Sequence, residues 1–438
     1  MSKKKIREIL KKIFFFPVSP KIFVAGIGLL RSAKALKRPC AGQIASPKRI
    51  LISHPYASVG DVVLVLPLID VIHRYWPDAL IDIVVGANTA EFFTGHRQVN
   101  QVFRYRPTQS PLLLVRVYLR VLQALMLYRR EMMQTNYDLA VAPRWDSDPD
   151  SLLARYVAYL TGAPWRCAYS GGIDGGDKTV DDLLTHVAHG GESEHEVLRY
   201  TRLIDRAGLA TFTMEERNFV EAPIERLVEV AKVNDTIELR KLIAESIPST
   251  FKNYAIISPG ATNSRRIWPA DKLSQLLAML NSRYGLSFLI VGSLADALSC
   301  ERLAQSAPAY AVSLAGKTNT SQLTAIIYNS VLFVGNDSGP GHIAGALGVP
   351  TLIVSPFPLS CSLDHPNAPA RFRPCGPRVK VVQPPSPLPP CNPYCNLDEA
   401  HCITQVSVND MFDAANSLLR GAVGNRWSRI NMRSLANP

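Results

Sequence analysis

The stretch "RILISHPYASVGDVVLVLPLIDVIHRYWPDALIDIVVG", residues 49–86, decides the fold of this chain. An apolar strand at 50–53 leads through a loop at 55–60 into a helix at 62–76 with an apolar stripe, and a second strand follows at 81–85. Strands that are apolar throughout are typical of parallel sheets, which are buried on both faces. The order strand, loop, helix, strand therefore predicts the start of a doubly wound parallel sheet.

The same order begins again in "YAIISPGATNSRRIWPADKLSQLLAMLNSRYGLSFLIVGS", residues 254–293, after a polar stretch at 222–252. A chain of 438 residues is long enough to bury two domain cores. We therefore expect an α/β protein with two Rossmann-like domains that face a cleft. Ligands of such sheets bind at the carboxyl ends of the strands.

A third strand end lies in "VGNDSGPGHIAGALGVP", residues 334–350. Ser338 is predicted to cap a helix, and the free N–H groups at a helix start favour an anion. We expect Ser338, Gly339 and His342 to contact this anion and Asp337 to accept hydrogen bonds from sugar hydroxyls. The alternative is an ordinary capped turn in which the aspartate is structural.

The loop after the first strand carries a candidate catalytic carboxylate. Ser58 and Gly60 allow a tight turn with free amides, and Asp61 stands at the start of the next helix. The prediction is that Asp61 is a general base that removes a proton from a hydroxyl group. The alternative is an aspartate kept there by the helix dipole.

The loop at 259–269 carries two consecutive arginines just ahead of a helix. Arg265 and Arg266 follow Thr262 and Asn263 in this loop. Arginine forms bidentate, charge-assisted bonds with phosphate, so the pattern predicts a phosphate clamp. A solvated pair of charges is the alternative.

The excess positive charge lies at the N-terminus. Residues 1–49 contain 13 Lys and Arg and one acid, which accounts for the formal net charge of +12. Because the rest of the chain is neutral, a nucleic-acid partner is not expected. Basic residues around short apolar patches within 1–38 predict a contact with an anionic membrane surface, and a solvated tail is the alternative.

Four of the eight cysteines lie near the C-terminus, at Cys375, Cys391, Cys395 and Cys402. The spacing of these cysteines matches no common zinc pattern. A role in packing or in a local cross-link is therefore favoured over metal binding. Whether they bind a metal or form a disulfide stays open. No P-loop, G-x-G-x-x-G after the first strand, H-E-x-x-H or nucleophile elbow is present, which argues against ATP hydrolysis, nicotinamide redox chemistry and metalloprotease activity.

Taken together, the motifs "SVGDVVLVLPLIDVIHRYWPDALIDIVV", "PGATNSRRIWP", "GNDSGPGHIAGALGVPTLIV" and "CNPYCNLDEAHCI", in this order, resemble glycosyltransferase family 9, which includes the bacterial lipopolysaccharide heptosyltransferases. The resemblance covers roughly residues 49–422. It implies a GT-B architecture with the acceptor on the N-terminal domain and a nucleotide sugar on the C-terminal domain. It places the family's general base on Asp61, its diphosphate-holding cation on Arg266, and its donor motif on Asp337, Ser338, Gly339 and His342.

The expected domains are a basic arm at 1–48, an acceptor domain at 49–245, a nucleotide-sugar domain at 246–405, a helix at 406–422 across the interdomain seam, and a tail at 423–438. The basic arm departs from the family pattern, in which many members begin near the first strand.

The resemblance implies an inverting transfer of a heptose or related sugar, with no bound metal or cofactor, from a nucleoside-diphosphate donor to a lipid-linked glycan. The expected location is the cytoplasm, including the inner face of the plasma membrane. A nucleotide-sugar epimerase and a non-catalytic scaffold of envelope assembly are the alternatives.

Overall fold

The computed structural model describes residues 42–106, 113–144, 149–172, 178–191, 193–211, 219–246, 253–360 and 368–420. The basic arm up to residue 41 and the tail after residue 420 lie outside these ranges. By their contacts the residues form two units, Met1–Glu192 with Val197–Glu215 and Ser193–Glu196 with Glu216–Pro438. Within the described ranges, no helix is both long enough and apolar enough to cross a bilayer.

The first unit contains a six-stranded parallel sheet in the order β3-β2-β1-β4-β5-β6. This is the strand order of a Rossmann fold. Its strands are β1 (Arg49–Ser53), β2 (Leu80–Gly86), β3 (Val99–Tyr105), β4 (Leu139–Ala142), β5 (Trp165–Tyr169) and β6 (His186–Ala188). Its helices are α3 (Val59–Tyr75), η3 (Ala90–Phe93), α4 (Leu113–Leu127), the π-helical η4 (Tyr128–Met132), α5 (Pro149–Leu160), η6 (Lys178–Leu183) and α6 (Glu196–Arg206).

The second unit repeats this plan with the order β12-β11-β10-β7-β8-β9, again all parallel. Its strands are β7 (Tyr254–Ser258), β8 (Ser287–Ile290), β9 (Ala311–Ser313), β10 (Leu332–Asn336), β11 (Thr351–Val354) and β12 (Val379–Val382). Its helices are α7 (Glu225–Val233), α8 (Ile237–Ser246), η7 (Ser264–Arg266), α9 (Ala270–Tyr284), η8 (Leu294–Asp296), α10 (Ala297–Gln305), α11 (Thr320–Tyr328), α12 (Gly339–Ala346), α13 (Pro369–Phe372), η9 (Cys402–Gln405) and α14 (Val408–Arg420). Two Rossmann-like units confirm the predicted fold class.

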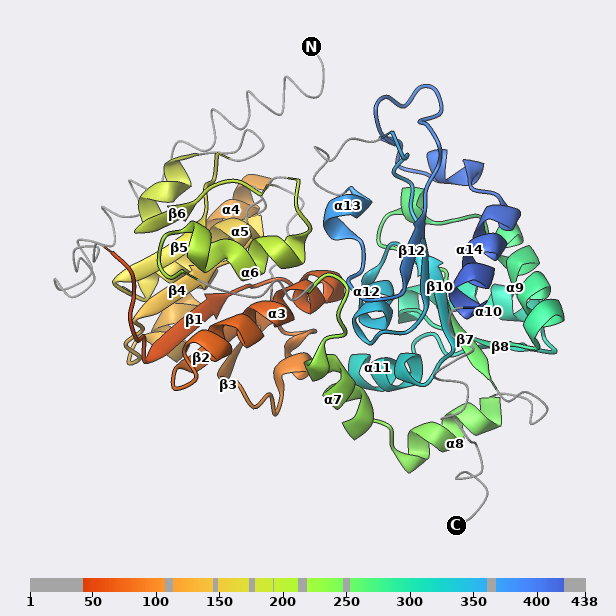
Figure 1. Ribbon diagram of the computed structural model, residues 1–438, viewed down its shortest axis with the longest axis horizontal. Coiled ribbons are helices and arrows are strands. Elements are labelled where there is room, and N and C mark those ends of the chain that lie inside the picture. The colour runs from red at the N-terminus through yellow and green to blue at the C-terminus, as the bar shows by residue number, and fades with distance from the viewer. Residues whose placement is uncertain are drawn as a thin grey trace. The chain divides into compact units, whose positions relative to one another are not determined.

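Each face of the second sheet is covered by a different set of helices, with α9, α10 and α14 on one side and α11 and α12 on the other (Figure 1). Alternate residues of β7, such as Ala255 and Ile257, join a core that includes Leu276 of α9 and Leu418 of α14. This alternation follows from the two-residue period of a strand. The final helix thus packs on its own sheet, while its predicted crossing of the seam stays a prediction.

The linker between the sheets packs with the second unit. The N–H group of Ile224, just before α7, donates to the carbonyl oxygen of Ala346 at 2.7 Å. The N–H group of Gly376 donates to the carbonyl oxygen of Val220 at 2.6 Å. These contacts place the boundary between the two units near residue 216, earlier than the predicted boundary at 245, because α7 packs against α11 of the second unit.

Candidate active site

Both sheets have a point where the strand order reverses, between β1 and β4 in the first unit and between β7 and β10 in the second. Ligands of doubly wound sheets bind at the carboxyl ends of the strands at this point. The candidate residues Asp61 and Arg266 follow β1 and β7, and Asp337 follows β10. The topology thus puts the predicted charged residues at the two positions where ligand binding is expected.

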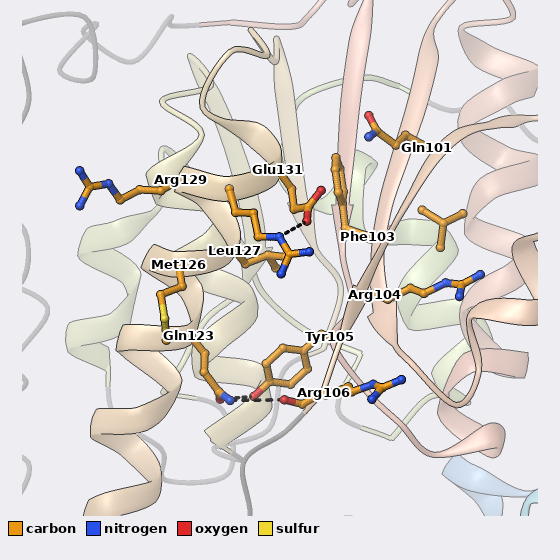
Figure 2. Close-up of a pocket in the computed structure, with 12 residues that line it drawn as sticks. Gln101, Phe103, Arg104, Tyr105, Arg106, Gln123, Met126, Leu127, Arg129 and Glu131 are labelled. Atoms are coloured by element: carbon orange, nitrogen blue, oxygen red, sulfur yellow. Dashed lines mark hydrogen bonds and ion pairs between the residues drawn. The ribbon is translucent and has the colours of Figure 1, made fainter.

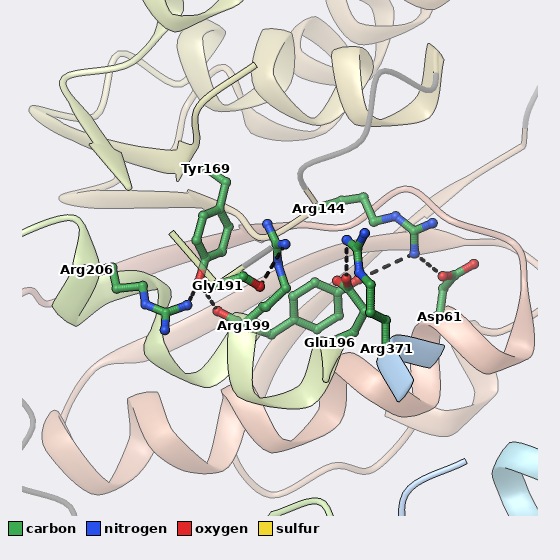
Figure 3. Close-up of polar contacts among 9 residues, drawn as sticks. Asp61, Arg144, Tyr169, Gly191, Glu196, Arg199, Arg206 and Arg371 are labelled. Carbon is green, nitrogen blue, oxygen red and sulfur yellow. Dashed lines mark hydrogen bonds and ion pairs between the residues drawn. The ribbon is translucent and has the colours of Figure 1, made fainter. Parts of the chain in front are cut away.

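In the first unit, Asp61 is held by an arginine that the sequence interpretation missed. Asp61 lies in the first turn of α3, and the Nη1 of Arg144, just after β4, forms an ion pair with its carboxylate (Figure 3). The two side chains are only 16% and 11% exposed. A nearby guanidinium favours the charged carboxylate, which is the form that accepts a proton.

Aromatic side chains fix the position of Arg144. Its guanidinium carbon lies 4.8 Å from the ring centre of Tyr56, and its Nη1 donates to the Tyr200 hydroxyl at 3.5 Å. The ring of His54 contacts both tyrosines, with centroid distances of 4.9 and 5.9 Å. A guanidinium that lies over one ring and donates to the hydroxyl of a second tyrosine is restrained, so Arg144 can hold the Asp61 carboxylate in one orientation.

In the second unit, Arg266 and Asp337 come together. The Nη1 of Arg266 lies 3.3 Å from the Asp337 carboxylate and 3.4 Å from the Asp337 carbonyl oxygen. Both side chains keep some exposure, 26% for the arginine and 13% for the aspartate. The cation and the carboxylate therefore lie at one site and can both reach a ligand.

Asn336, which the sequence interpretation did not single out, ties the two loops of this site together. Its Oδ1 accepts a hydrogen bond from the N–H group of Trp268 at 3.0 Å, and its Nδ2 donates to the carbonyl oxygen of Pro259 at 2.5 Å. The Trp268 indole is 2% exposed and donates to the carbonyl oxygen of Val406 at 3.1 Å. These bonds hold the arginine loop against the end of β10.

Ser338 occupies the predicted N-cap position of α12, but its hydroxyl does not cap the helix. The Oγ is buried, and among the described residues it has no hydrogen-bond partner. A buried hydroxyl without a partner is costly, so a ligand at the helix N-terminus would satisfy it. Gly341 lets α12 approach the sheet, since a Cβ there would lie 2.7 Å from Ile353 Cδ1.

His342 is buried on α12 with 6% exposed, in the same region as His195. The Nε2 of His195 donates to the carbonyl oxygen of Arg373 at 2.8 Å. Burial, with smaller contributions from the charges of Arg373 and His342, lowers the pKa of His195 from 6.5 to about 4. This histidine is neutral at neutral pH.

The depressed pKa of His195 predicts an acid-labile fold. The unfolded chain takes up a proton below about pH 6.5, whereas the folded chain does so only near pH 4, so stability is complete above pH 6.5 and falls as the pH drops toward 4. At pH 4.5 the loss is about 2–3 kcal/mol. Urea unfolding of wild type and His195→Gln at pH 7 and 4.5 measures it. An equal loss in both proteins would contradict the assignment.

The remaining predicted donor residues lie on the arginine loop. Asn263 accepts a hydrogen bond from the N–H group of Arg265 at 3.1 Å and so caps the short helix η7, while Thr262 is exposed. Among the acceptor-side residues, Ser58 is the N-cap position of α3 and Gly60 is buried in its first turn. These residues shape the two loops, and their contact with substrates stays a prediction.

A basic cavity of about 750 Å³ lies in the first unit beside β3, α4 and η4, and its lining includes none of the predicted site residues (Figure 2). Four of its lining residues are exposed arginines: Arg104, Arg106, Arg129 and Arg130. The one acidic lining residue, Glu131, pairs with Arg130 at 2.9 Å. The cavity therefore carries a net positive charge and suits an anionic group.

Arg144 and Asn336 could have been found from one signal in the sequence. Both stand where a buried strand ends, Asn336 as the last residue of β10 and Arg144 two residues after β4. Their roles depend on pairing between strands that are adjacent in the sheet but distant in sequence. Periodicity alone does not report that pairing.

Comparison with known proteins supports this fold and family. The family model of glycosyltransferase family 9 (heptosyltransferase) matches residues 128–385. The chain is 26% identical over 308 residues to lipopolysaccharide heptosyltransferase 3 of Escherichia coli K12, which covers 67% of this chain and 78% of that protein.

Solved structures show the same fold. A family 9 glycosyltransferase from Veillonella parvula aligns with a TM-score of 0.65 at 15% identity, over 87% of this chain and 99% of that one. The Escherichia coli ADP-heptose lipopolysaccharide heptosyltransferase II aligns with a TM-score of 0.59 at 18% identity, over 86% and 100%. The chain therefore belongs to glycosyltransferase family 9, the heptosyltransferases, and is a glycosyltransferase with a GT-B fold.

Proposed function

We propose that this enzyme transfers a heptose or a closely related sugar, with inversion, from an ADP-heptose-like donor to a lipopolysaccharide or another lipid-linked glycan. The observation that carries the proposal is a charged site in each sheet, at the point where the strand order reverses. In the first unit this site is the Asp61 carboxylate held by Arg144, and in the second unit it is the Arg266 guanidinium near the N-terminus of α12. The heptose and the acceptor class are suggested by the relatives, whose names specify an ADP-heptose donor and lipopolysaccharide.

The second unit supplies the donor side of the reaction. The guanidinium of Arg266, the N–H groups at the start of α12 and the Ser338 hydroxyl bind the diphosphate, and His342 lies one turn further along the helix. These groups offer positive charge and hydrogen bonds to the phosphate oxygens, where negative charge grows as the bond to the sugar breaks. Asp337, which pairs with Arg266 in the absence of a ligand, accepts a hydrogen bond from a sugar hydroxyl.

The first unit supplies the acceptor side. The acceptor hydroxyl oxygen forms a bond to the anomeric carbon while the bond from that carbon to the diphosphate oxygen breaks. Asp61 takes the hydroxyl proton, and the nucleoside diphosphate leaves with the electron pair of the broken bond. A single displacement of this kind inverts the anomeric configuration and needs only one carboxylate.

A thermal-shift screen of nucleotide sugars and nucleoside diphosphates tests the donor assignment. A donor at 100 times its Kd stabilises the folded protein by about 2.7 kcal/mol, which is a measurable rise in Tm. ADP and ADP-sugars are expected to raise the Tm more than UDP or GDP and their sugars. Stabilisation by UDP-sugars alone would contradict the donor class.

The first unit also offers a surface suited to an anionic membrane. Leu122, Met126 and Met133 are 52%, 60% and 57% exposed, beside the exposed Arg129 and Arg130. Apolar side chains flanked by cations suit the headgroup region of anionic lipids. We propose that this surface and the basic arm at 1–38 attach the enzyme to the membrane that carries its acceptor.

Deletion of residues 1–40 is expected to weaken binding to anionic vesicles while leaving transfer to a soluble acceptor intact. Each basic residue near such a surface contributes about 1 kcal/mol, so the loss is largest at low salt. In the truncated protein, Met126→Glu should weaken binding further. Leu298→Glu, at a position 65% exposed in the second unit, is the matched control. Equal vesicle sedimentation of the full-length and truncated proteins would contradict the role of the arm.

A further inference from the structure

Three cysteines and a histidine converge in the segment between β12 and α14. One potential ligand atom from each of Cys391, Cys395, His401 and Cys402 lies within 4.8 Å of all the others. The Nδ1 of His401 is 3.5 Å from the sulfur of Cys391 and 3.6 Å from that of Cys402. In a tetrahedral zinc site, with Zn–S of about 2.3 Å and Zn–N of about 2.05 Å, the separation of sulfur and nitrogen is about 3.6 Å. The geometry thus fits four atoms around one metal ion.

The surroundings of these side chains also suit a thiolate site. The three cysteine side chains are 5%, 1% and 0% exposed, and their described apolar neighbours are the partly buried Leu388 and Leu397. An apolar shell of this kind keeps water away from the sulfur and nitrogen atoms, as is usual around a protein metal site.

The segment that carries these ligands has few other stabilising features. Residues 383–401 contain neither helix nor strand, and six of them are prolines. A loop of this length without regular structure is uncommon in a compact domain. Three thiols and two leucines form a very small core, whereas a metal bound by four side chains contributes folding free energy directly.

We propose that Cys391, Cys395, His401 and Cys402 bind one tetrahedral transition-metal ion, zinc or iron, in a closed structural site. Three soft thiolates and an imidazole select these metals over magnesium or calcium, which prefer oxygen ligands. Four protein ligands leave no coordination position open for a substrate. The ion therefore shapes the fold and does not enter the transfer reaction.

This site also supports the donor loop, a point that rests on the proposed function. The carbonyl oxygens of Thr404 and Val406, directly after the ligands, accept hydrogen bonds from the Lys272 Nζ at 2.6 and 3.0 Å. The Val406 carbonyl also accepts the bond from the Trp268 indole, two residues after Arg266. Loss of the metal should loosen this anchor and so weaken binding of the donor diphosphate.

Elemental analysis of the full chain, purified without a metal-affinity step, tests the site. We expect about one zinc or iron per chain, and the element found identifies the ion. Cys395→Ser and His401→Ala should reduce the content to a small fraction of this value. Cys300→Ala, which removes a buried thiol outside the cluster, should leave it unchanged.

Two measurements keep the proposal testable if the variants fail to fold. Protein freed of metal with a thiophilic chelator should have a lower Tm, and added Co²⁺ should produce the visible absorption of a tetrahedral thiolate complex. Wild type with a negligible content of both metals, and no such cobalt spectrum, would overturn the proposal. So would a count of denatured thiols showing two of the three cysteines joined in a disulfide.

ADP binding separates the structural role from the proposed activity. We expect removal of the metal to raise the Kd for ADP, while addition and removal of Mg²⁺ leave it unchanged. An unchanged Kd after complete removal would overturn the link between this site and the donor loop. The metal content is measured without any substrate, so it tests the metal site independently of the proposed transfer reaction.

Discussion

Asp61→Asn is expected to reduce kcat by about 10²–10⁴-fold, because an amide cannot accept the proton of the acceptor hydroxyl. The substitution keeps the size of the side chain and its place in the first turn of α3. Asp61 belongs to the first unit and the diphosphate site to the second, so the Kd for ADP should stay close to the wild-type value. Initial rates at saturating donor and acceptor measure the effect.

The matched control for this variant is Asp78→Asn, an exposed aspartate of the same unit. It should keep the wild-type rate. Because Asp61→Asn leaves Arg144 beside a neutral amide, a thermal melt must show that the variant is folded before the rate is interpreted. A folded Asp61→Asn protein that keeps more than about a tenth of kcat would exclude this residue as the general base.

Arg266→Ala is expected to lose about 10²–10³-fold in kcat, equivalent to about 2.7–4 kcal/mol of transition-state stabilisation, and to bind ADP more weakly. The guanidinium interacts most strongly with the diphosphate as it departs, so the rate should fall more than the affinity. Arg266→Lys keeps the positive charge but loses the planar guanidinium that forms two parallel hydrogen bonds. Its kcat should therefore lie between those of wild type and Arg266→Ala. Arg302→Ala, at an exposed arginine of α10, is the control.

Asp337→Ala separates two roles of that carboxylate. If Asp337 binds a sugar hydroxyl, the variant should bind the nucleotide sugar less tightly and bare ADP as well as wild type, since Arg266 loses a competing partner at 3.3 Å. Calorimetric titration with both ligands measures the difference. Equal losses for ADP and donor would mean that Asp337 only shapes the turn.

The central strands could be predicted from the sequence because they are buried on both faces and therefore apolar throughout. The runs at 50–53 and 255–258 correspond to β1 and β7. The edge strands gave a weaker signal. In β3, three of the seven residues are exposed and polar and only two are fully buried, and β6 has only three residues. Their place depends on pairing with a neighbour, which a local pattern does not contain.

The site residues that could be predicted are those that follow a single strand recognisable in the sequence. Asp61, Arg266 and Asp337 were identified in this way, and the ion pair between the last two brings them to one place. Arg144 was missed because its partner lies 83 positions away, across two adjacent strands. His401 was missed because the ligand spacing follows no paired cysteine motif, and only the folded loop brings its ring to the thiols.

The most direct test of the proposed function is to incubate the purified enzyme with ADP-heptose, with and without a lipid-linked heptose acceptor. ADP release is measured together with the anomeric configuration of the product by NMR. The proposed function predicts release that requires the acceptor and a product whose anomeric configuration is inverted relative to the donor. Conversion of the donor without acceptor, or a product with retained configuration, would contradict an inverting glycosyltransferase.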